Sequence, residues 1–411
     1  MRIAVIGGGI AGLTAAWLLG VEHQVVLYEA ADSLGGNARS VLVGQPGSEI
    51  SATPGATFIL PGAYPYTIAL LRHFAVPLRR NPVGLTIVDE SRSVRWATPR
   101  LRRPAGVAES GDASGWLRLL AVAWKLERSG DWTLTWDRFI DALGVGDPFI
   151  HEVANPIVAA FWGLRPSEIG PLSARALLAY VSRPMPGAKR WVPGWPVECA
   201  DGTGRLVEAI TAGLGAIDIR LHAEVRSVVA SGSSLVVEQA EVGERYDRVI
   251  MAVPPWNANS LLGDPTLRDL GRLQRTLALI AIHCDEAMLP ENPSLHSPAM
   301  VVVGEGRSQL TTIVGRCGAS TVLRSWITNG GGPRNGILST TSFSHVAPTI
   351  DLFRVQETVR AWQGTRNCWL AGSWTWDVDS MESAVHSGLS SAEGIDSSAS
   401  RVRWLRGRAL V

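Results

Sequence analysis

The sequence is poor in charged residues and has almost no lysine. Asp, Glu, Lys and Arg together make up 18% of its 411 residues, against about 25% in a typical globular protein. Only Lys125 and Lys189 among the 38 basic residues are lysines. The formal net charge is +1, so no global field favours nucleic acid or an anionic membrane. The scarcity of lysine also limits any chemistry that needs a primary amine.

Cysteines are few and dispersed, at positions 199, 284, 317 and 368, with no C-x-x-C pair. This spacing argues against a zinc site or a dithiol redox centre, and we expect reduced thiols and no metal. No uncharged apolar run approaches the roughly 18 residues that cross a bilayer. The chain also passes from Met1 directly into an apolar β-branched segment, unlike a secretory leader. We therefore expect a cytoplasmic protein without membrane contact.

The length and the apolar content indicate a folded protein with more than one structural unit. A chain of 411 residues predicts two domains, or one large domain with a subdomain. Apolar residues reach 46%, enough to build a large core and to line an apolar cavity. The same composition argues against intrinsic disorder.

The first thirty residues predict a βαβ unit. An apolar, β-branched run at 3–6 precedes a glycine-rich turn. A helix is expected over 13–19, and a second strand over 23–28. The context required for a dinucleotide-binding turn is therefore complete.

The glycine pattern in this unit is Gly7-x-Gly9-x-x-Gly12, and Glu29 ends the second strand. Gly7 permits a tight turn, Gly9 lets the backbone approach a pyrophosphate, and Gly12 lets the helix pack close to the strand. The helix N-terminus then faces the phosphate charge. Glu29 would accept hydrogen bonds from a ribose diol, and it disfavours NADP because it would repel a 2′-phosphate.

Two further blocks suit the same nucleotide. A second glycine pair, Gly35-Gly36, is followed by Arg39, so backbone N–H groups and a guanidinium are predicted near the phosphates. Close to the C-terminus, the apolar run 369–375 leads through a loop to a helix start at 380–388. The N–H groups at such a helix start suit the negative charge of a reduced flavin.

These blocks, in this order and with a middle block at 202–254, resemble the flavin-containing amine oxidase and phytoene-desaturase superfamily. The segments 282–285, 344–345 and 362–364 resemble its bacterial NAD/FAD-binding subgroup. The resemblance implies an α/β fold, with a discontinuous Rossmann-like FAD-binding domain, a mixed α+β substrate domain and non-covalent FAD. It implies adenine near Glu29 and Val225, pyrophosphate near Gly9, and flavin near Arg39 and Met381. The full set of expected cofactor-binding residues is Gly7, Gly9, Ile10, Ala11, Gly12, Glu29, Gly35, Gly36, Arg39, Val225, Gly372, Ser373, Trp374 and Met381.

The order of elements predicts an interleaved domain organisation. Residues 1–63, 197–258 and 346–400 are assigned to the FAD-binding domain, 64–196 to a mostly helical cap, 259–345 to the sheet of the substrate domain, and 401–411 to a solvated tail. Within that sheet, strands are expected at 276–284, 299–303, 310–316 and 321–328.

The sequence also departs from the amine oxidases of this superfamily. These usually carry a lysine on the substrate-domain strand, but 276–284 contains none. Ser380 stands where they place an aromatic-cage tyrosine, and Trp374 where they place an acidic residue. No Ser-Gly-Gly-Cys motif supports covalent attachment of the flavin. An amine-oxidase mechanism that needs the lysine is therefore weakened.

Few residues are expected to take part in the reaction itself, because hydride transfer is the chemistry of the cofactor. Trp374 and Trp376 are candidates for the pocket wall. His283 is a candidate general base, since imidazole titrates near neutrality. Each has a plain alternative: the tryptophans as core residues, and His283 as a hydrogen-bonded structural histidine.

We expect an FAD-dependent oxidase, dehydrogenase or desaturase that removes a hydride from an apolar or amphipathic small molecule, with specialised metabolism as a candidate setting. Three alternatives stay open: an FAD-dependent amine oxidase, a non-redox flavoenzyme such as an isomerase or dehydratase, and a catalytically idle FAD-binding partner protein. The substrate, the electron acceptor and the oligomeric state do not follow from the residues.

Overall fold

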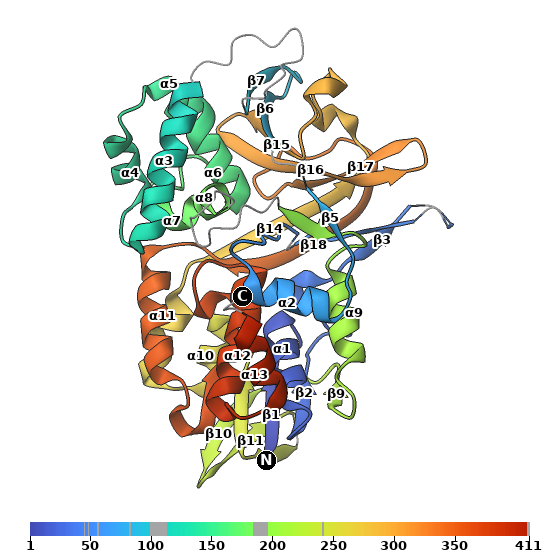
Figure 1. Ribbon diagram of the computed structural model, residues 1–411, viewed down its shortest axis with the longest axis vertical. Coiled ribbons are helices and arrows are strands. Elements are labelled where there is room, and N and C mark those ends of the chain that lie inside the picture. The colour runs from blue at the N-terminus through green and yellow to red at the C-terminus, as the bar shows by residue number, and fades with distance from the viewer. Residues whose placement is uncertain are drawn as a thin grey trace.

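The structure is a computed structural model that describes residues 1–408 except 45, 48, 56, 82–83, 99–112, 184–195 and 241. Two bodies are stacked along the long axis (Figure 1). The lower body contains a parallel sheet and both ends of the described chain, and the upper body contains a large mixed sheet beside a group of helices. The α/β fold expected from the sequence is thereby confirmed.

The lower body is built on a five-stranded parallel sheet in the order β19-β13-β1-β2-β9. Its central strand is buried on both faces, which explains its continuous apolar, β-branched sequence. A three-stranded antiparallel sheet, β10-β11-β12, lies at the same end. The strands are β1 (Arg2–Ile6), β2 (Gln24–Tyr28), β9 (Asp218–Arg220), β10 (Ser227–Ser231), β11 (Ser234–Glu238), β12 (Gly243–Tyr246), β13 (Arg248–Met251) and β19 (Cys368–Leu370).

Helix α1 (Ile10–Leu19) is the buried helix of this body, and all ten of its residues are buried. It packs along α12 (Met381–Ile395), so the first helix and a distant late helix lie side by side (Figure 1). Gly388 allows this contact, because a Cβ there would lie 2.4 Å from the Ala11 carbonyl oxygen. The other helices of this body are α2 (Pro65–His73), α9 (Gly204–Ala212), α10 (Pro255–Leu262), α11 (Ile350–Trp362) and α13 (Ser400–Gly407).

The upper body contains a seven-stranded sheet in the order β18-β14-β17-β16-β15-β6-β7, antiparallel except between β15 and β6. The four strands expected over 276–328 are all present, and β18 is an additional one. The strands are β6 (Leu85–Asp89), β7 (Val94–Ala97), β14 (Arg275–His283), β15 (Ala299–Gly304), β16 (Arg307–Cys317), β17 (Ser320–Trp326) and β18 (Ile337–Val346). Two short ribbons, β3 (Val41–Val43) with β4 (Ile50–Ala52) and β5 (Leu78–Arg80) with β8 (Val197–Cys199), complete the strands.

The expectation of a mostly helical segment over 64–196 needs correction. Three strands, β5, β6 and β7, follow helix α2 and precede α3, and two of them extend the seven-stranded sheet. The segment Leu85–Asp89 is apolar and β-branched, but its parallel partner β15 lies about 200 residues later, so local pattern alone does not reveal the pairing. After α2, the α-helices of this segment are α3 (Ala113–Ser129), α4 (Trp136–Leu143), α5 (Asp147–Phe149), α6 (Asn155–Trp162), α7 (Ala174–Leu177) and α8 (Ala179–Ser182).

The expected solvated tail is also a correction, because 400–407 forms helix α13. Its Val402 and Leu405, three positions apart on one face, are buried against the lower body. Arg401 donates a hydrogen bond to the Trp17 carbonyl oxygen at 2.7 Å and places its guanidinium 4.6 Å from that indole ring. The alternation of cations and apolar residues in this segment is therefore that of an amphipathic helix packed on the lower body.

Among the described residues, no helix is both long enough and apolar enough to cross a membrane.

Candidate active site

The turn between β1 and α1 is fixed by close backbone packing. The Gly7 N–H donates to the Tyr28 carbonyl oxygen at 2.8 Å, which ties the turn to the next strand. A Cβ on Gly12 would lie 1.9 Å from the Gly7 carbonyl oxygen, so only glycine fits there. These two glycines are required by the protein's own packing.

Gly9, in the same turn, is different. Its φ of −72° is accessible to any residue, and a Cβ built on it meets no heavy atom within 4 Å. Nothing in the protein requires glycine at this position. The space beside Gly9 belongs to the large cavity, which Gly7, Gly9, Ile10 and Ala11 line. A side chain at this position would fill space that the backbone otherwise leaves open to the cavity, and such a space suits a pyrophosphate.

The second glycine pair closes on the first turn. The Gly35 N–H donates to the Gly8 carbonyl oxygen at 2.8 Å, and Gly35 and Gly36 both line the cavity. Arg39 does not line it: the exposed guanidinium donates to the Gly36 carbonyl oxygen at 3.1 Å and to Ser33 Oγ at 3.0 Å. The expected phosphate contact of Arg39 is corrected accordingly, since these bonds direct it toward its own loop.

Glu29 lines the cavity at the end of β2. Its Oε2 accepts from the Gly8 N–H at 2.7 Å and its Oε1 from the Ala31 N–H at 2.8 Å. These two bonds hold the carboxylate in one orientation between the two glycine turns. Val225 and its neighbour Glu224 line the same end of the cavity. This is the end at which the sequence predicts the adenosine part of the nucleotide.

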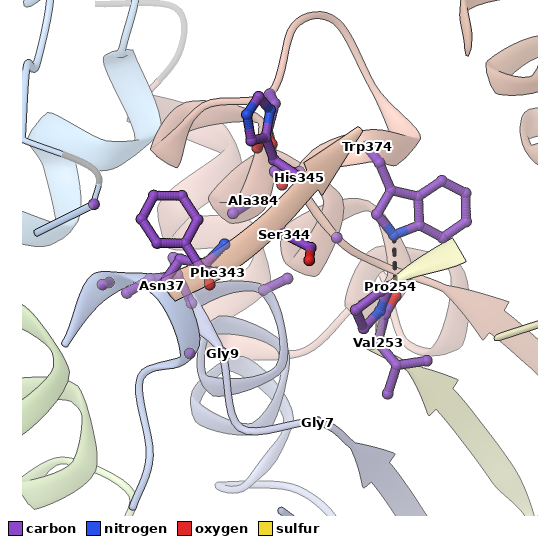
Figure 2. A pocket seen from close by; sticks show the side chains of 18 of the residues that line it. Gly7, Gly9, Asn37, Val253, Pro254, Phe343, Ser344, His345, Trp374 and Ala384 are labelled. Carbon is purple, nitrogen blue, oxygen red and sulfur yellow. Dashed lines mark hydrogen bonds between the residues drawn. The ribbon is translucent and has the colours of Figure 1, made fainter. Parts of the chain in front are cut away.

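The C-terminal block reaches the cavity from the opposite side. Gly372, Ser373, Trp374 and Met381 line it, with Met381 in the first turn of α12. Figure 2 shows the Trp374 indole beside Val253, whose carbonyl oxygen accepts from Nε1 at 3.0 Å. The Ser380 side chain caps α12 by accepting from the Ser383 N–H at 3.1 Å. Ser380 and Met381 are thus part of an ordered helix N-terminus facing the cavity.

The cavity has a volume of about 510 Å³, within the range of small-molecule sites. It runs from the glycine turns to the seven-stranded sheet, where Phe343 and His345 of β18 project above Gly9 and Asn37 (Figure 2). Aromatic side chains from several elements surround this upper part. They are Phe58, Tyr64, Phe161, Trp162, Tyr180, Trp326 and Phe343. Sequence reasoning missed them, because α6, β17 and β18 meet only in the folded chain.

Two buried polar side chains also line the upper part. His345 belongs to a segment that carries the subgroup resemblance but was given no role from the sequence, and Arg324 was not anticipated. His345 is 8% exposed, and its Nε2 has no hydrogen-bond partner among the described residues. Burial lowers the pKa of His345, while the nearby Asp379 carboxylate opposes this shift, so the ring is neutral at neutral pH. Arg324 of β17 is 5% exposed and donates to the Thr53 carbonyl oxygen at 3.0 Å. Both face the cavity from the sheet.

His283, expected as a catalytic base, does not line the cavity. Its Nδ1 accepts from the Asp285 N–H at 3.1 Å and its Nε2 lies 2.9 Å from Ser325 Oγ. Burial lowers its pKa to about 4, although Asp285 opposes the shift. Successive residues of a strand point to opposite faces, and Ile282 pairs with Arg324. His283 therefore faces the other side of the sheet, and it is a hydrogen-bonded structural residue.

Trp376 is likewise not among the cavity residues. Its ring stacks on His386 with 3.9 Å between centroids and 19° between planes. Of the two tryptophans proposed for the pocket wall, only Trp374 lies there. Lys125 is on α3 away from the cavity lining, and Lys189 falls outside the described residues. None of the described lining residues is a lysine.

A family model for flavin-containing amine oxidoreductases matches residues 10–321, more than half of the chain. The chain belongs to this family. It is therefore a flavin-dependent oxidoreductase, and the family resemblance inferred from the glycine turns and the C-terminal block is confirmed. A comparison with curated protein sequences gives no significant match.

Solved structures of similar fold cover almost the whole chain at low sequence identity. Cyclohexylamine oxidase from Brevibacterium oxydans IH-35A has a TM-score of 0.69 at 15% identity, covering 98% of this chain and 99% of its own. Putrescine oxidase bound to putrescine has a TM-score of 0.70 at 14% identity, with coverage of 97% and 99%. A fatty acid isomerase from P. acnes that produces CLA has a TM-score of 0.66 at 16% identity, with coverage of 94% and 97%. These likenesses establish the fold.

Proposed function

We propose that the protein binds FAD non-covalently and removes a hydride from an apolar or amphipathic small molecule. The observation that carries this proposal is one continuous cavity. At one end it has the residues suited to an adenosine diphosphate. At the other end the aromatic side chains of the upper part, from Phe58 to Phe343, enclose what we call the aromatic chamber. A bound flavin accepts a hydride at its ring, and an external electron acceptor must then reoxidise it.

Different lining residues are suited to different parts of the nucleotide. The Glu29 carboxylate is placed to accept hydrogen bonds from the ribose, and Val225 to contact the adenine. The backbone at Gly9, Ile10 and Ala11 faces the pyrophosphate from the N-terminus of α1. Trp374 and Met381 flank the flavin end. None of the four cysteines lines this cavity, which supports non-covalent binding.

The chain's own residues in the chamber bind, orient and exclude water. The aromatic side chains offer an apolar surface, and neutral His345 presents an unpartnered ring nitrogen that can accept a hydrogen bond or a proton. The absence of lysine from the described lining favours oxidation within a carbon skeleton over oxidation of a primary amine. An amine oxidase is the weaker candidate for that reason.

Anaerobic mixing of the purified holoprotein with candidate substrates tests the proposal. Loss of the visible flavin absorbance would support net oxidation, whereas product formation with no change in redox state would support an isomerase or dehydratase. If neither amines nor lipophilic compounds changed the flavin spectrum or gave a product, an idle FAD-binding role would replace the proposal. Acid denaturation should release all of the flavin as free FAD, and flavin that stays on the polypeptide would contradict non-covalent binding.

A further inference from the structure

Arg324 is a buried cation whose charge the described protein does not neutralise. It lies on β17 of the seven-stranded sheet, paired with Ile282 of β14 and Thr312 of β16. Arg324 lines the aromatic chamber, with the guanidinium 5.8 Å from the centre of the Phe58 ring, and it also lines a small adjoining cavity with Thr53 and Glu198. Within the described residues, its hydrogen-bond acceptor is the Thr53 carbonyl oxygen, and no carboxylate lies within ion-pair distance.

Arg183, another buried arginine of the chain, has carboxylates that neutralise its charge. Arg183 is equally buried, and its guanidinium contacts Asp377 at 2.6 Å and Glu127 at 3.3 Å. The pKa of Arg183 is raised by these two carboxylates against the effect of burial. Burial instead lowers the pKa of Arg324 to about 10. The acid that acts on Arg324 from a distance, Glu198, is already paired with Arg79 at 2.6 Å.

A buried guanidinium without a counter-ion is costly, and a guanidinium presents five N–H donors in a rigid fork. The geometry that satisfies this fork is a carboxylate, held by two parallel hydrogen bonds. The other formally charged residues that line the cavity, Glu29, Glu224 and Asp379, are all acidic. Among the described lining residues, Arg324 is therefore the one cation that can bind an anionic group.

We propose that Arg324 binds the carboxylate of the substrate, and that the substrate is an amphipathic carboxylic acid whose apolar part lies among the aromatic side chains of the chamber. This inference rests on the proposed function, because it assigns the substrate class of the same cavity. It adds a specificity-determining residue on β17 that neither the glycine motifs nor the C-terminal block indicates.

The test is ligand binding to the FAD-loaded protein, followed by the visible flavin spectrum and by calorimetry. Two matched series serve as probes: phenylacetate, phenylacetamide and phenethylamine, and decanoate, decanamide and decylamine. Within at least one series, the carboxylate should bind with a Kd at least about tenfold lower than its neutral amide, the gain of roughly one charge-assisted hydrogen bond. The amine should bind no better than the amide.

Substitution of the arginine should remove this preference. Arg324→Gln should weaken carboxylate binding about thirtyfold or more, while amide binding changes less than about threefold. Arg324→Lys keeps the charge but not the fork, so its carboxylate affinity should fall between the two. Arg316→Gln is the matched control, because Arg316 lies on the same sheet with its exposed side chain bonded to the Ala319 carbonyl oxygen.

The outcomes separate this inference from the proposed function. If the wild-type protein does not bind FAD, both fail. If it binds FAD but carboxylates and amides bind alike, or if Arg324→Gln keeps the carboxylate preference, the inference fails and the proposed function stands. Loss of FAD from Arg324→Gln and Arg324→Lys alone would assign the arginine to the cofactor and overturn the inference. If Arg324→Gln does not fold, the wild-type preference and the intermediate affinity of Arg324→Lys decide the question.

Discussion

Replacement of Gly9 by valine should separate cofactor binding from folding. The backbone at Gly9 has an ordinary φ of −72°, and a Cβ there meets no protein atom within 4 Å. Replacing glycine in a compatible conformation stabilises by about 0.4–1 kcal/mol through the unfolded state. Loss of glycine from the helix N-cap costs up to about 1 kcal/mol. We therefore expect the free energy of unfolding without FAD to change by less than about 1 kcal/mol.

The effect of Gly9→Val on the cofactor should be far larger. Its branched side chain would occupy the space in which the backbone approaches the pyrophosphate. Displacing the phosphate from two backbone donors, at about 1.5–3 kcal/mol for each bond to a charged group, weakens FAD binding by roughly 10²–10⁴-fold. With FAD at about 100 times the wild-type Kd, the wild type gains about 2.7 kcal/mol of stability, and the variant gains almost none.

The assay combines the flavin content of the purified protein with urea unfolding in the presence and absence of added FAD. Gly407→Ala is the neutral control, because a Cβ there also meets no atom within 4 Å but the site is on the remote helix α13. Gly12→Ala is the opposite control and should lose stability even without FAD, since its Cβ would lie 1.9 Å from the Gly7 carbonyl oxygen. A Gly9→Val protein that folds and retains a full complement of FAD would refute the reasoning.

Three further variants test other parts of the site. Glu29→Gln keeps only one of the two acceptors for the N–H groups of Gly8 and Ala31. FAD affinity should therefore fall about tenfold or more, while turnover at saturating FAD persists. An equal loss of FAD affinity and of turnover would contradict this role. Trp374→Phe removes the bond to the Val253 carbonyl oxygen and should cost about 1 kcal/mol, with flavin retained and kcat/KM altered; unchanged kinetics would make Trp374 a packing residue. His283, whose pKa falls from its ordinary value near 6.5 to about 4 on folding, binds its proton more readily in the unfolded chain. The contribution of His283 to the free energy of unfolding should thus drop by about 3 kcal/mol as pH falls from 6.5 to 4. His283→Gln should remove this part of the pH dependence, measured by urea unfolding at several pH values. An unchanged pH dependence would contradict the lowered pKa of His283.

The cofactor half of the site was predictable because its signals are local in the sequence. The glycines of the first turn, the acid at the end of β2 and the second glycine pair all occur within the first 40 residues. Each has a specific conformational or electrostatic reason to be there. Arg39 was the exception: its side chain closes its own loop, and sequence spacing does not tell a guanidinium facing a ligand from one facing its own backbone.

The chamber half was not predictable, because its residues become neighbours through strand pairing over long separations. Strand β18 has a polar sequence, ILSTTSFSHV, without the apolar run that marks a buried strand, so no strand was predicted at Phe343 and His345. Arg324, in the mixed sequence STVLRSW of β17, resembles a solvent-facing residue until the fold covers it. The tail shows the same effect, since the apolar residues of α13 have meaning only against the surface of α1.

The choice of the wrong histidine follows from the same geometry. In an antiparallel pair, directly opposite residues share a face of the sheet, and a shift of one residue moves a side chain to the other face. Ile282 is opposite Arg324 and Ala278 is opposite Phe343, so even-numbered positions of β14 face the cavity and His283 does not. Burial does not reveal this parity, because the last four residues of β14 are all buried. His345 is two residues after Phe343 in β18, so its side chain points to the same face of the sheet. His345 and Arg324 therefore both face the chamber.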